Sequence, residues 1–253
     1  MTYKALIIDL DGTTIGNGQF TRPTKRVIDA VVRAKKKVTV CAATGRPLST
    51  ARWIFNDLHL TSPSIISSGT KIIDPVTEHI FWQVRMDTAT VATVLHIAAQ
   101  FPYKTYADSQ LDTYPPKKTY SLQEESVIYI VEIPIAQSSN IIARLQQIPS
   151  LRVTRIRAYN QTHLDIHITS PDGTKGNAIS HLRKLLGIAK KDCIGIGDSY
   201  NDLSLFEEVG LKIAMGNASP ELKERADYIT SHVTQDGLAQ AIEKFILDPA
   251  SSA

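Results

Sequence analysis

Ala5-Leu6-Ile7-Ile8-Asp9-Leu10-Asp11-Gly12-Thr13 contains four apolar residues followed at once by two carboxylates, a glycine and a hydroxyl. A short apolar run that ends in this way is typical of a central parallel strand, whose carboxyl end faces the ligand crevice of an open α/β sheet. Because side chains alternate in extended chain, Asp9 and Asp11 share one side. The stretch alone is equally compatible with a solvated turn. Its meaning therefore depends on the segments that follow.

Three later segments also place polar groups at the end of an apolar run or a turn. Thr44-Gly45-Arg46 follows a second apolar run, and Asp198-Ser199-Tyr200-Asn201-Asp202 follows a third. Lys175 comes after a turn and precedes a predicted helix over 176–186. Taken singly, Thr44 is typical of a helix N-cap and Lys175 of a solvated side chain. Four such segments in one chain favour a shared site, where a hydroxyl and a glycine suit an anion.

In this order the segments resemble the motifs of the haloacid dehalogenase superfamily of phosphohydrolases, which are D-x-D-x-T, a Thr or Ser, a Lys, and G-D-x-x-x-D. The match is closer to the Cof-type subfamily, with T-G-R, K-G and G-D-S-x-N-D. The resemblance covers essentially the whole chain and implies an α/β cap of class IIB between Thr44 and Lys175. The chain departs from the family at Ser67-Ser68-Gly69-Thr70, where relatives usually carry Asn-Gly, and this puts the substrate contact of that Asn in doubt.

The alternation of predicted strands and helices indicates an α/β fold with a Rossmann-like parallel sheet core and a smaller inserted α/β cap domain. We assign residues 1–80 and 171–253 to the core and 81–170 to the cap. Predicted core strands cover 5–9, 38–43, 64–67, 193–197 and 212–215, and predicted core helices cover 24–37, 47–58, 176–186, 202–209, 220–225 and 237–247. The cap is predicted to contain helices over 88–101 and 139–148 and strands over 126–133 and 162–168. Right-handed crossovers would place the strands ending in Thr44 and Asp198 on either side of the first strand, making Asp9 the switch point.

Composition excludes several other classes of protein. The 253 residues are 43% hydrophobic and 21% charged, which is enough for one large or two modest domains. The basic runs at 35–37, 117–118 and 190–191 are short and lack interleaved aromatics, so we expect no nucleic-acid partner. Two cysteines in apolar runs suit a reducing compartment, and no apolar stretch approaches ~18 residues. We therefore expect a cytoplasmic protein with no membrane partner, and the oligomeric state stays open.

The excess of negative charge at the predicted site indicates a metal ion. If Asp9, Asp198 and Asp202 meet a dianionic phosphate, each like-charge pair costs about 4 kcal/mol at ~4 Å and an effective dielectric near ~20. Lys175 alone cannot neutralise that charge. Carboxylate oxygens without a nearby His or Cys select Mg²⁺ over zinc, so Mg²⁺ is the expected cofactor.

The resemblance also implies roles for single residues. The residues implied in catalysis are Asp9, Asp11, Thr44 and Lys175. The residues implied in substrate binding are Leu10 and Gly45 through their amides, Arg46 and Asn201. The residues implied in metal binding are Asp9, Asp11 through its carbonyl, Asp198 and Asp202. Asp9 would attack phosphorus to form an aspartyl-phosphate, and Asp11 would protonate the leaving alkoxide and later deprotonate water.

The expected function is that of a magnesium-dependent phosphatase acting on a small phosphorylated metabolite, such as a sugar phosphate. A phosphotransferase or phosphomutase of the same superfamily is one alternative, although the cap of mutases follows the first motif, where only residues 12–23 precede the next helix here. A receiver-type signalling module phosphorylated on Asp is another. Such a module places its acid pair and its phosphorylated Asp on different strands, and it needs no inserted cap.

One pattern in the cap resembles a site. In the run over 162–168 the apolar residues alternate, so that His163, Asp165 and His167 lie on one face of a strand. This face is either a second metal site or, as we favour, a polar face that is solvated or directed toward the active site. Residues 112–118 of the cap are expected to help set the choice of substrate.

Overall fold

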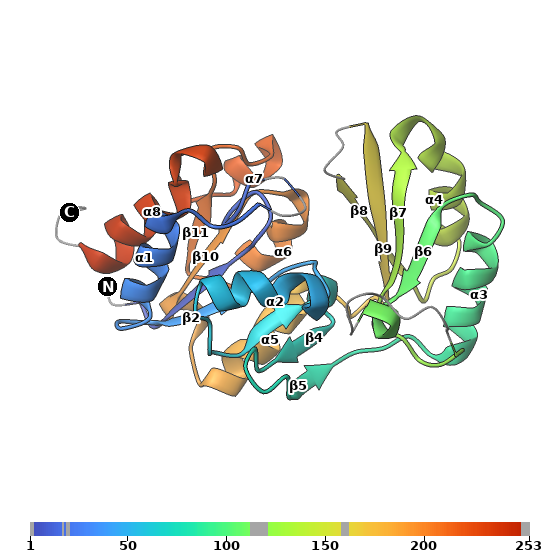
Figure 1. Ribbon diagram of the computed structural model, residues 1–253, viewed down its shortest axis with the longest axis horizontal. Helices are drawn as coiled ribbons and strands as arrows, with labels where there is room; N and C mark the ends of the chain where they lie inside the picture. The colour runs from blue at the N-terminus through green and yellow to red at the C-terminus, as the bar shows by residue number, and fades with distance from the viewer. Residues whose placement is uncertain (1–2, 17, 19–20, 112–120, 158–161, 249–253) are drawn as a thin grey trace.

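The computed structural model describes residues 3–16, 18, 21–111, 121–157 and 162–248. Two bodies lie side by side in Figure 1, the core on the left and the cap on the right. Each has its own hydrophobic core. One cluster of buried side chains is formed by residues from 5–73 and 178–247, and the other by residues from 86–168.

A parallel sheet of five strands forms the centre of the core, in the order β12-β11-β10-β1-β2. Its strands are β1 (Ala5–Ile8), β2 (Thr39–Ala42), β10 (Cys193–Gly197), β11 (Leu211–Ala214) and β12 (Tyr228–Ile229). Ile8 lies level with Ala42 on one side and with Ile196 on the other. The strands that lead to Thr44 and Asp198 therefore flank the first strand, as predicted, and their carboxyl ends meet at one edge.

The helices of the core are α1 (Lys25–Ala34), α2 (Leu48–Asp57), α5 (Lys175–Leu186), α6 (Leu203–Phe206), α7 (Pro220–Glu224) and α8 (Gly237–Ile242), followed by a π-helical turn over Glu243–Leu247. Side-chain caps mark the start of three of these helices, α1, α5 and α7. Thr174 caps α5 by accepting a hydrogen bond from the amide of Asn177 at 3.0 Å. At the other end Gly187 adopts a φ of 66°, a conformation that favours glycine. Lys175 is thereby fixed at the first position of α5.

A second, antiparallel sheet of the core was only partly predicted. Its order is β3-β4-β5, with β3 at Ser64–Ile66, β4 at Lys71–Ile73 and β5 at Ile80–Gln83. A parallel bridge between Ala43 and Ile65 joins it to the end of β2. The expected domain boundary at residue 81 lies inside β5, so we propose that the division follows Gln83.

The cap contains an antiparallel sheet in the order β6-β7-β9-β8. Its elements are β6 (Lys104–Ala107), β7 (Ile128–Pro134), β8 (Arg152–Arg157) and β9 (His163–Thr169), with α3 (Thr88–Ala98) and α4 (Ser138–Gln146). The two helices pack against each other, and Figure 1 places both on one side of this sheet. Strands β6 and β8 were not predicted. Short 3-10 turns cover Ser67–Gly69, Asp108–Leu111, Ile135–Gln137, Lys190–Asp192, Tyr200–Asp202 and Val233–Gln235.

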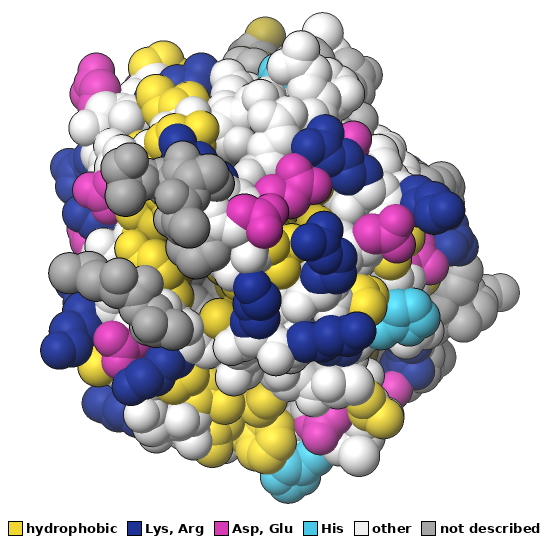
Figure 2. Space-filling view, turned by 90° about the vertical axis from the view of Figure 1, so that its left-hand side faces the viewer, with side chains coloured by type: hydrophobic (Ala, Val, Ile, Leu, Met, Phe, Trp, Pro, Cys, Tyr) yellow, Lys and Arg dark blue, Asp and Glu magenta, His cyan; other side chains and the backbone are white. Residues whose placement is uncertain are grey.

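Charges on the outer end of the core are mixed in sign. Figure 2 shows this end, where the side chains of Lys and Arg are interspersed with those of Asp and Glu. Ion pairs link some of them, such as Arg26 and Glu243, whose charged atoms lie 2.8 Å apart. Cys41 and Cys193 are buried free thiols. Within the described part of the chain, the helices are too short or too polar to cross a membrane.

Candidate active site

The first loop after β1 is shaped by contacts that only glycine allows. The carbonyl of Leu10 accepts hydrogen bonds from the amides of Thr14 and Ile15 at 2.8 and 2.9 Å, which folds the chain back on itself. Gly12 has a φ of 77°, and a Cβ at this position would lie 2.1 Å from a carboxylate oxygen of Asp198. The D-x-D-G stretch therefore brings its backbone directly against the aspartate that follows β10.

Three carboxylates meet at this edge of the sheet. Oxygen atoms of Asp9, Asp198 and Asp202 lie within 4.8 Å of one another. The ammonium of Lys175 lies 2.6 Å from Asp9 and 2.7 Å from Asp202. Lys175, Asp9 and Asp202 are each at most 4% exposed. The four residues come from three separate segments of the sequence and thus form one largely buried charged cluster.

The cluster carries more negative charge than its lysine balances. Burial, helped by the charge of Asp202, raises the pKa of Asp9 to about 7. Burial and the charge of Asp9 raise the pKa of Asp198 to about 9. Burial alone would lower the pKa of Lys175, but Asp202 and Asp9 raise it overall. A site that resists ionisation in this way is suited to a further positive charge.

The donor atoms fit a divalent metal ion. The group consists of hard carboxylate oxygens, the ligand type that Mg²⁺ and Ca²⁺ prefer. Asp202 already has partners for both oxygens, since Oδ1 accepts from Lys175 and Oδ2 accepts from the amides of Asp198 and Ser199, each at 3.1 Å. We infer that Asp9 and Asp198 are the side chains available to a metal, and that Asp202 positions Lys175 and the loop.

Asn217 is a site residue that sequence reasoning missed. Its side-chain amide donates to the carbonyl of Gly12 at 2.8 Å and to Asp198 at 3.4 Å, and its oxygen accepts from the amide of Val233 at 2.9 Å. Asn217 therefore holds the first loop against Asp198. It follows β11, so a polar residue shortly after a fourth strand end was the available signal.

Asp11 and Arg46 form an ion pair that the sequence did not reveal. The guanidinium contacts both carboxylate oxygens, at 2.8 and 2.6 Å, and also donates to the carbonyl of Thr50 at 3.2 Å. Its carbon lies 5.9 Å from the centre of the Trp53 ring. Such a bidentate contact fixes the direction of the Asp11 carboxylate.

The remaining predicted residues divide into two groups. Thr44 is fully buried at the end of β2, and its hydroxyl accepts a hydrogen bond from the amide of Arg46 at 3.1 Å. Gly45 lies between them. Asn201 is placed differently, because its side-chain oxygen accepts from Ser199 in its own turn. The structure thus places Thr44 and Gly45 at the same edge of the sheet as the cluster and gives Asn201 a local partner.

The polar face of β9 does not form a metal site. Asp165 accepts a hydrogen bond from the amide of Glu132 at 2.8 Å, and His163 pairs with the hydroxyl of Thr162 at 2.9 Å. Only His167 reaches the core, where its Nδ1 lies 2.6 Å from the hydroxyl of Ser68. In the described ranges the metal-spaced group is the aspartate cluster. The prediction for residues 112–118 lies outside the described residues.

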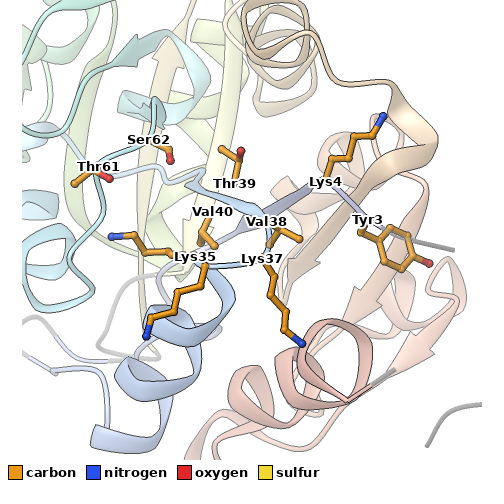
Figure 3. Close-up of a pocket in the computed structure, with 10 residues that line it drawn as sticks. Tyr3, Lys4, Lys35, Lys37, Val38, Thr39, Val40, Thr61 and Ser62 are labelled. Carbon is orange, nitrogen blue, oxygen red and sulfur yellow. The ribbon is translucent and has the colours of Figure 1, made fainter. Parts of the chain in front are cut away.

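A pocket also lies at the other edge of the sheet. It has a volume of about 480 Å³ and lies at the amino ends of β1 and β2. Figure 3 shows its lysines pointing away from one another. Lys4 pairs with Asp192 at 2.9 Å, Lys35 donates to the carbonyl of His59, and Lys37 donates to that of Leu247 at 2.8 Å. With these ammoniums already engaged, the pocket does not compete with the aspartate cluster.

Known proteins resemble this chain in sequence and fold. The family model for haloacid dehalogenase-like hydrolases matches residues 6–242. A 5-amino-6-(5-phospho-D-ribitylamino)uracil phosphatase of Bacillus subtilis is 28% identical, with 96% of both chains covered. A haloacid dehalogenase-like hydrolase from Bacteroides thetaiotaomicron has a TM-score of 0.82 at 21% identity, over 96% of this chain and 99% of that one. A HAD subclass IIB sugar phosphatase has a TM-score of 0.77 at 21% identity, over 96% of this chain and 98% of that one. Because the family model spans the core, the cap and all four motif segments, the chain belongs to the haloacid dehalogenase-like hydrolase family.

Proposed function

We propose that the protein is a magnesium-dependent phosphatase that hydrolyses a small phosphorylated metabolite through an aspartyl-phosphate intermediate. One observation carries the proposal. Asp9, a carboxylate at the end of the central strand, lies 2.6 Å from a buried lysine, and a second acid follows two residues later on the same loop. Hydrolysis of a phosphate ester through an aspartyl-phosphate needs a nucleophile, a cation that binds the phosphate oxygens and an acid that protonates the leaving group.

The metal would be held by the side chains of Asp9 and Asp198 and by the backbone carbonyl of Asp11. When bound, Mg²⁺ supplies the positive charge that lets these carboxylates and a phosphate dianion share one site. The raised pKa values of Asp9 and Asp198 support this assignment, because burial and neighbouring carboxylates disfavour the charged form of both groups, which a bound cation would favour.

Each step of the reaction would then be carried out by particular residues of this chain. Asp9 attacks phosphorus in line with the leaving oxygen. Lys175, the hydroxyl of Thr44 and the amides near Leu10 and Gly45 hold the phosphate oxygens, where fixed donors in a water-poor site stabilise the charge of the transition state. Asp11 gives a proton to the leaving alkoxide and later takes one from the attacking water.

Arg46 has a positioning part in this scheme. Its two contacts with Asp11 set where the carboxylate points before a substrate arrives. Arg46 is only 8% exposed, and its backbone amide also donates to Thr44. A single residue thereby connects the proposed acid and base with the phosphate-holding hydroxyl.

The substrate is proposed to be small. A cap with its own core lies against the site through His167, which restricts access for a macromolecule. One relative is named for a phosphoribitylamino compound and one solved neighbour is named a sugar phosphatase. These names support an ester of a hydroxylated carbon chain.

Turnover of p-nitrophenyl phosphate by the purified protein tests the proposal. We expect hydrolysis when Mg²⁺ is added at a concentration well above its Kd for the site. Chelation with EDTA should abolish it, and restored Mg²⁺ should return it. Hydrolysis that is unaffected by EDTA, or no hydrolysis of this ester or of any member of a phosphorylated-metabolite panel, would contradict the proposal.

A further inference from the structure

His167 is a cap residue that contacts the core. It belongs to β9, pairs in register with Tyr129 of β7, and is 9% exposed. Two contacts fix the imidazole. Nδ1 lies 2.6 Å from the hydroxyl of Ser68, and the ring meets the Tyr129 ring edge to face with centroids 4.8 Å apart. The side chain is therefore preorganised rather than free to rotate.

The imidazole lies over the phosphate-holding loop. A Cβ on Gly45 would be 3.4 Å from its Cε1 and 3.6 Å from its Nδ1. Gly45 stands between Thr44 and Arg46, so the imidazole lies beside the loop that is proposed to hold the phosphate. Charges of Asp11 and Lys175 act on the same ring. The second nitrogen, Nε2, is bonded to Cε1, the ring atom that comes nearest to Gly45.

The hydrogen bonds of Ser68 bear on which nitrogen of His167 carries the proton. Burial lowers the pKa of His167 to about 4, so the ring is neutral and has one donor and one acceptor nitrogen. The hydroxyl of Ser68 lies 2.6 Å from Nδ1 and 3.5 Å from the carbonyl of Gly45. In the tautomer in which Ser68 donates along the shorter contact, to Nδ1, the ring proton lies on Nε2. Among the described residues, Nε2 has no hydrogen-bond partner.

The loop that presents Ser68 is held in an uncommon conformation. Ser67 and Ser68 have φ values of 51° and 60°, in the region that non-glycine residues seldom adopt. Ser67 is held there by its amide, which donates to the carbonyl of Arg46 at 2.8 Å, and by its hydroxyl, which donates to Asp108 of the cap at 2.8 Å. Strain kept by such contacts is typical of functional positions. It places the Ser68 hydroxyl against the cap histidine.

We propose that His167 is a specificity-determining residue, whose Nε2–H donates a hydrogen bond to a hydroxyl or carbonyl oxygen on the leaving group of the phosphate ester. This inference rests on the proposed phosphatase function. It also gives Ser68 a role, since its hydroxyl holds the imidazole. In this chain the residue after the third strand supports a cap side chain, and the cap side chain contacts the substrate.

A pair of esters with the same carbon skeleton tests the inference. Glycerol 1-phosphate carries two hydroxyls that n-propyl phosphate lacks. The ratio of their kcat/KM values measures recognition of the leaving group, independently of how fast the enzyme is. We expect the wild-type protein to prefer glycerol 1-phosphate by about tenfold or more, since a buried donor left unpaired by the propyl ester disfavours it.

His167→Phe keeps the ring and its contact with Tyr129 but removes both nitrogens. We expect the ratio to fall about tenfold, with kcat/KM for n-propyl phosphate changed less than about threefold. His163→Phe is the matched control, because His163 lies on the same face of β9 and pairs only locally. It should leave the ratio unchanged. Ser68→Ala should lower the ratio in part, since Nδ1 loses the donor that fixes the tautomer, and it serves if His167→Phe does not fold.

The outcomes separate the inference from the proposed function. Equal losses of kcat/KM on both esters would show that His167 only supports the cap, and unchanged kcat/KM values on both esters would show that it does not touch the leaving group. Either result overturns the inference, as does a wild type without the preference, or a nitrogen-15 spectrum with the His167 proton on Nδ1. Loss of all phosphatase activity in the wild type, p-nitrophenyl phosphate included, overturns the proposed function instead.

Discussion

Replacing Asp198 by Asn is expected to stabilise the metal-free protein. In an unfolded chain this carboxyl titrates near 3.8, whereas in the folded cluster its pKa is about 9. At pH 7 folding must therefore either protonate Asp198 or bury its charge, which costs about 1.4 kcal/mol for each of roughly three pH units, or ~4 kcal/mol. Asn lacks this cost. It weakens the contact with the Asn217 amide by about 1 kcal/mol, so the expected net gain is ~3 kcal/mol.

The direction of the pH dependence follows from the same shift. An acid whose pKa is higher in the folded state than in the unfolded state binds more protons when folded. The contribution of Asp198 to the free energy of unfolding is then greatest below pH ~4 and falls as the pH rises toward ~9. We expect the wild-type apo protein to lose free energy of unfolding steadily over this window, with a smaller slope in Asp198→Asn. Bound Mg²⁺ should reverse the order, since wild type gains about 4.1 kcal/mol at a metal concentration of ~1,000 Kd and the variant gains little.

Urea unfolding at pH 5, 7 and 8.5, roughly spanning the window, measures these differences with EDTA and with Mg²⁺. Asp29→Asn is the matched control, because Asp29 is exposed on α1 and its replacement should alter neither slope nor metal response. An apo variant that is less stable than wild type at pH 8.5 would refute the reasoning. Such a result would mean that Lys175 stabilises the Asp198 charge more than burial opposes it.

Three further predictions concern catalysis and the junction with the cap. Asp9→Asn should reduce magnesium-dependent turnover of p-nitrophenyl phosphate below a few per cent while circular dichroism stays unchanged; retained turnover would remove Asp9 as nucleophile. Asp11→Asn should slow turnover by about 10²- to 10⁴-fold, and acid-quenched samples should carry phosphate on the peptide with Asp9, detected by mass spectrometry; a label found only elsewhere would contradict both roles. Lys71→Met should lower the free energy of unfolding in urea by about 3–5 kcal/mol, because it leaves Asp108 buried without its ion pair. Adding Asp108→Asn to the same protein should recover part of this loss. If the two substitutions instead cause additive losses, the ion pair does not contribute to stability.

The core strands could be predicted because each ends in a chemical signal. The apolar runs before Asp9, Thr44 and Asp198 are short, buried and followed by polar groups, so both pattern and motif identify them. Strands β4 and β5 have neither feature. Lys71–Ile73 has only three residues, and Ile80–Gln83 is mostly exposed, so these strands depend on pairing with each other rather than on a pattern in either.

The predicted helix over 202–209 shows how a functional side chain changes local structure. The carboxylate of Asp202 accepts from the amides of Asp198 and Ser199, and the Ser199 hydroxyl completes a capping box. This closes a 3-10 turn over Tyr200–Asp202, and the α-helix that follows has only four residues. Residue periodicity gives no sign of this interruption, because its cause is the need to bring Asp202 to Lys175.

Contacts between distant segments could not be predicted from the sequence. Alternation along β9 correctly groups His163, Asp165 and His167 on one face, but it cannot tell which of them meets another part of the protein. The same holds for the pairing of Asp11 with Arg46, since Arg46 is equally suited to contact a phosphate. These contacts depend on how the cap and the loops pack, which periodicity does not encode.

The residues proposed for catalysis and the residue proposed for substrate selection lie in different domains of this fold. Every side chain proposed for catalysis comes from strand ends or α5 of the core, and these groups are tied to one another by the charge cluster. His167 comes from the cap and is connected to the core by one hydrogen bond to Ser68. Substitutions at 68 and 167 can therefore alter the group that meets the leaving alcohol without altering the charges around the phosphate. Because the two residues share a hydrogen bond, their effects on selectivity should be coupled, whereas their effects on the pKa values of Asp9 and Asp198 should be small.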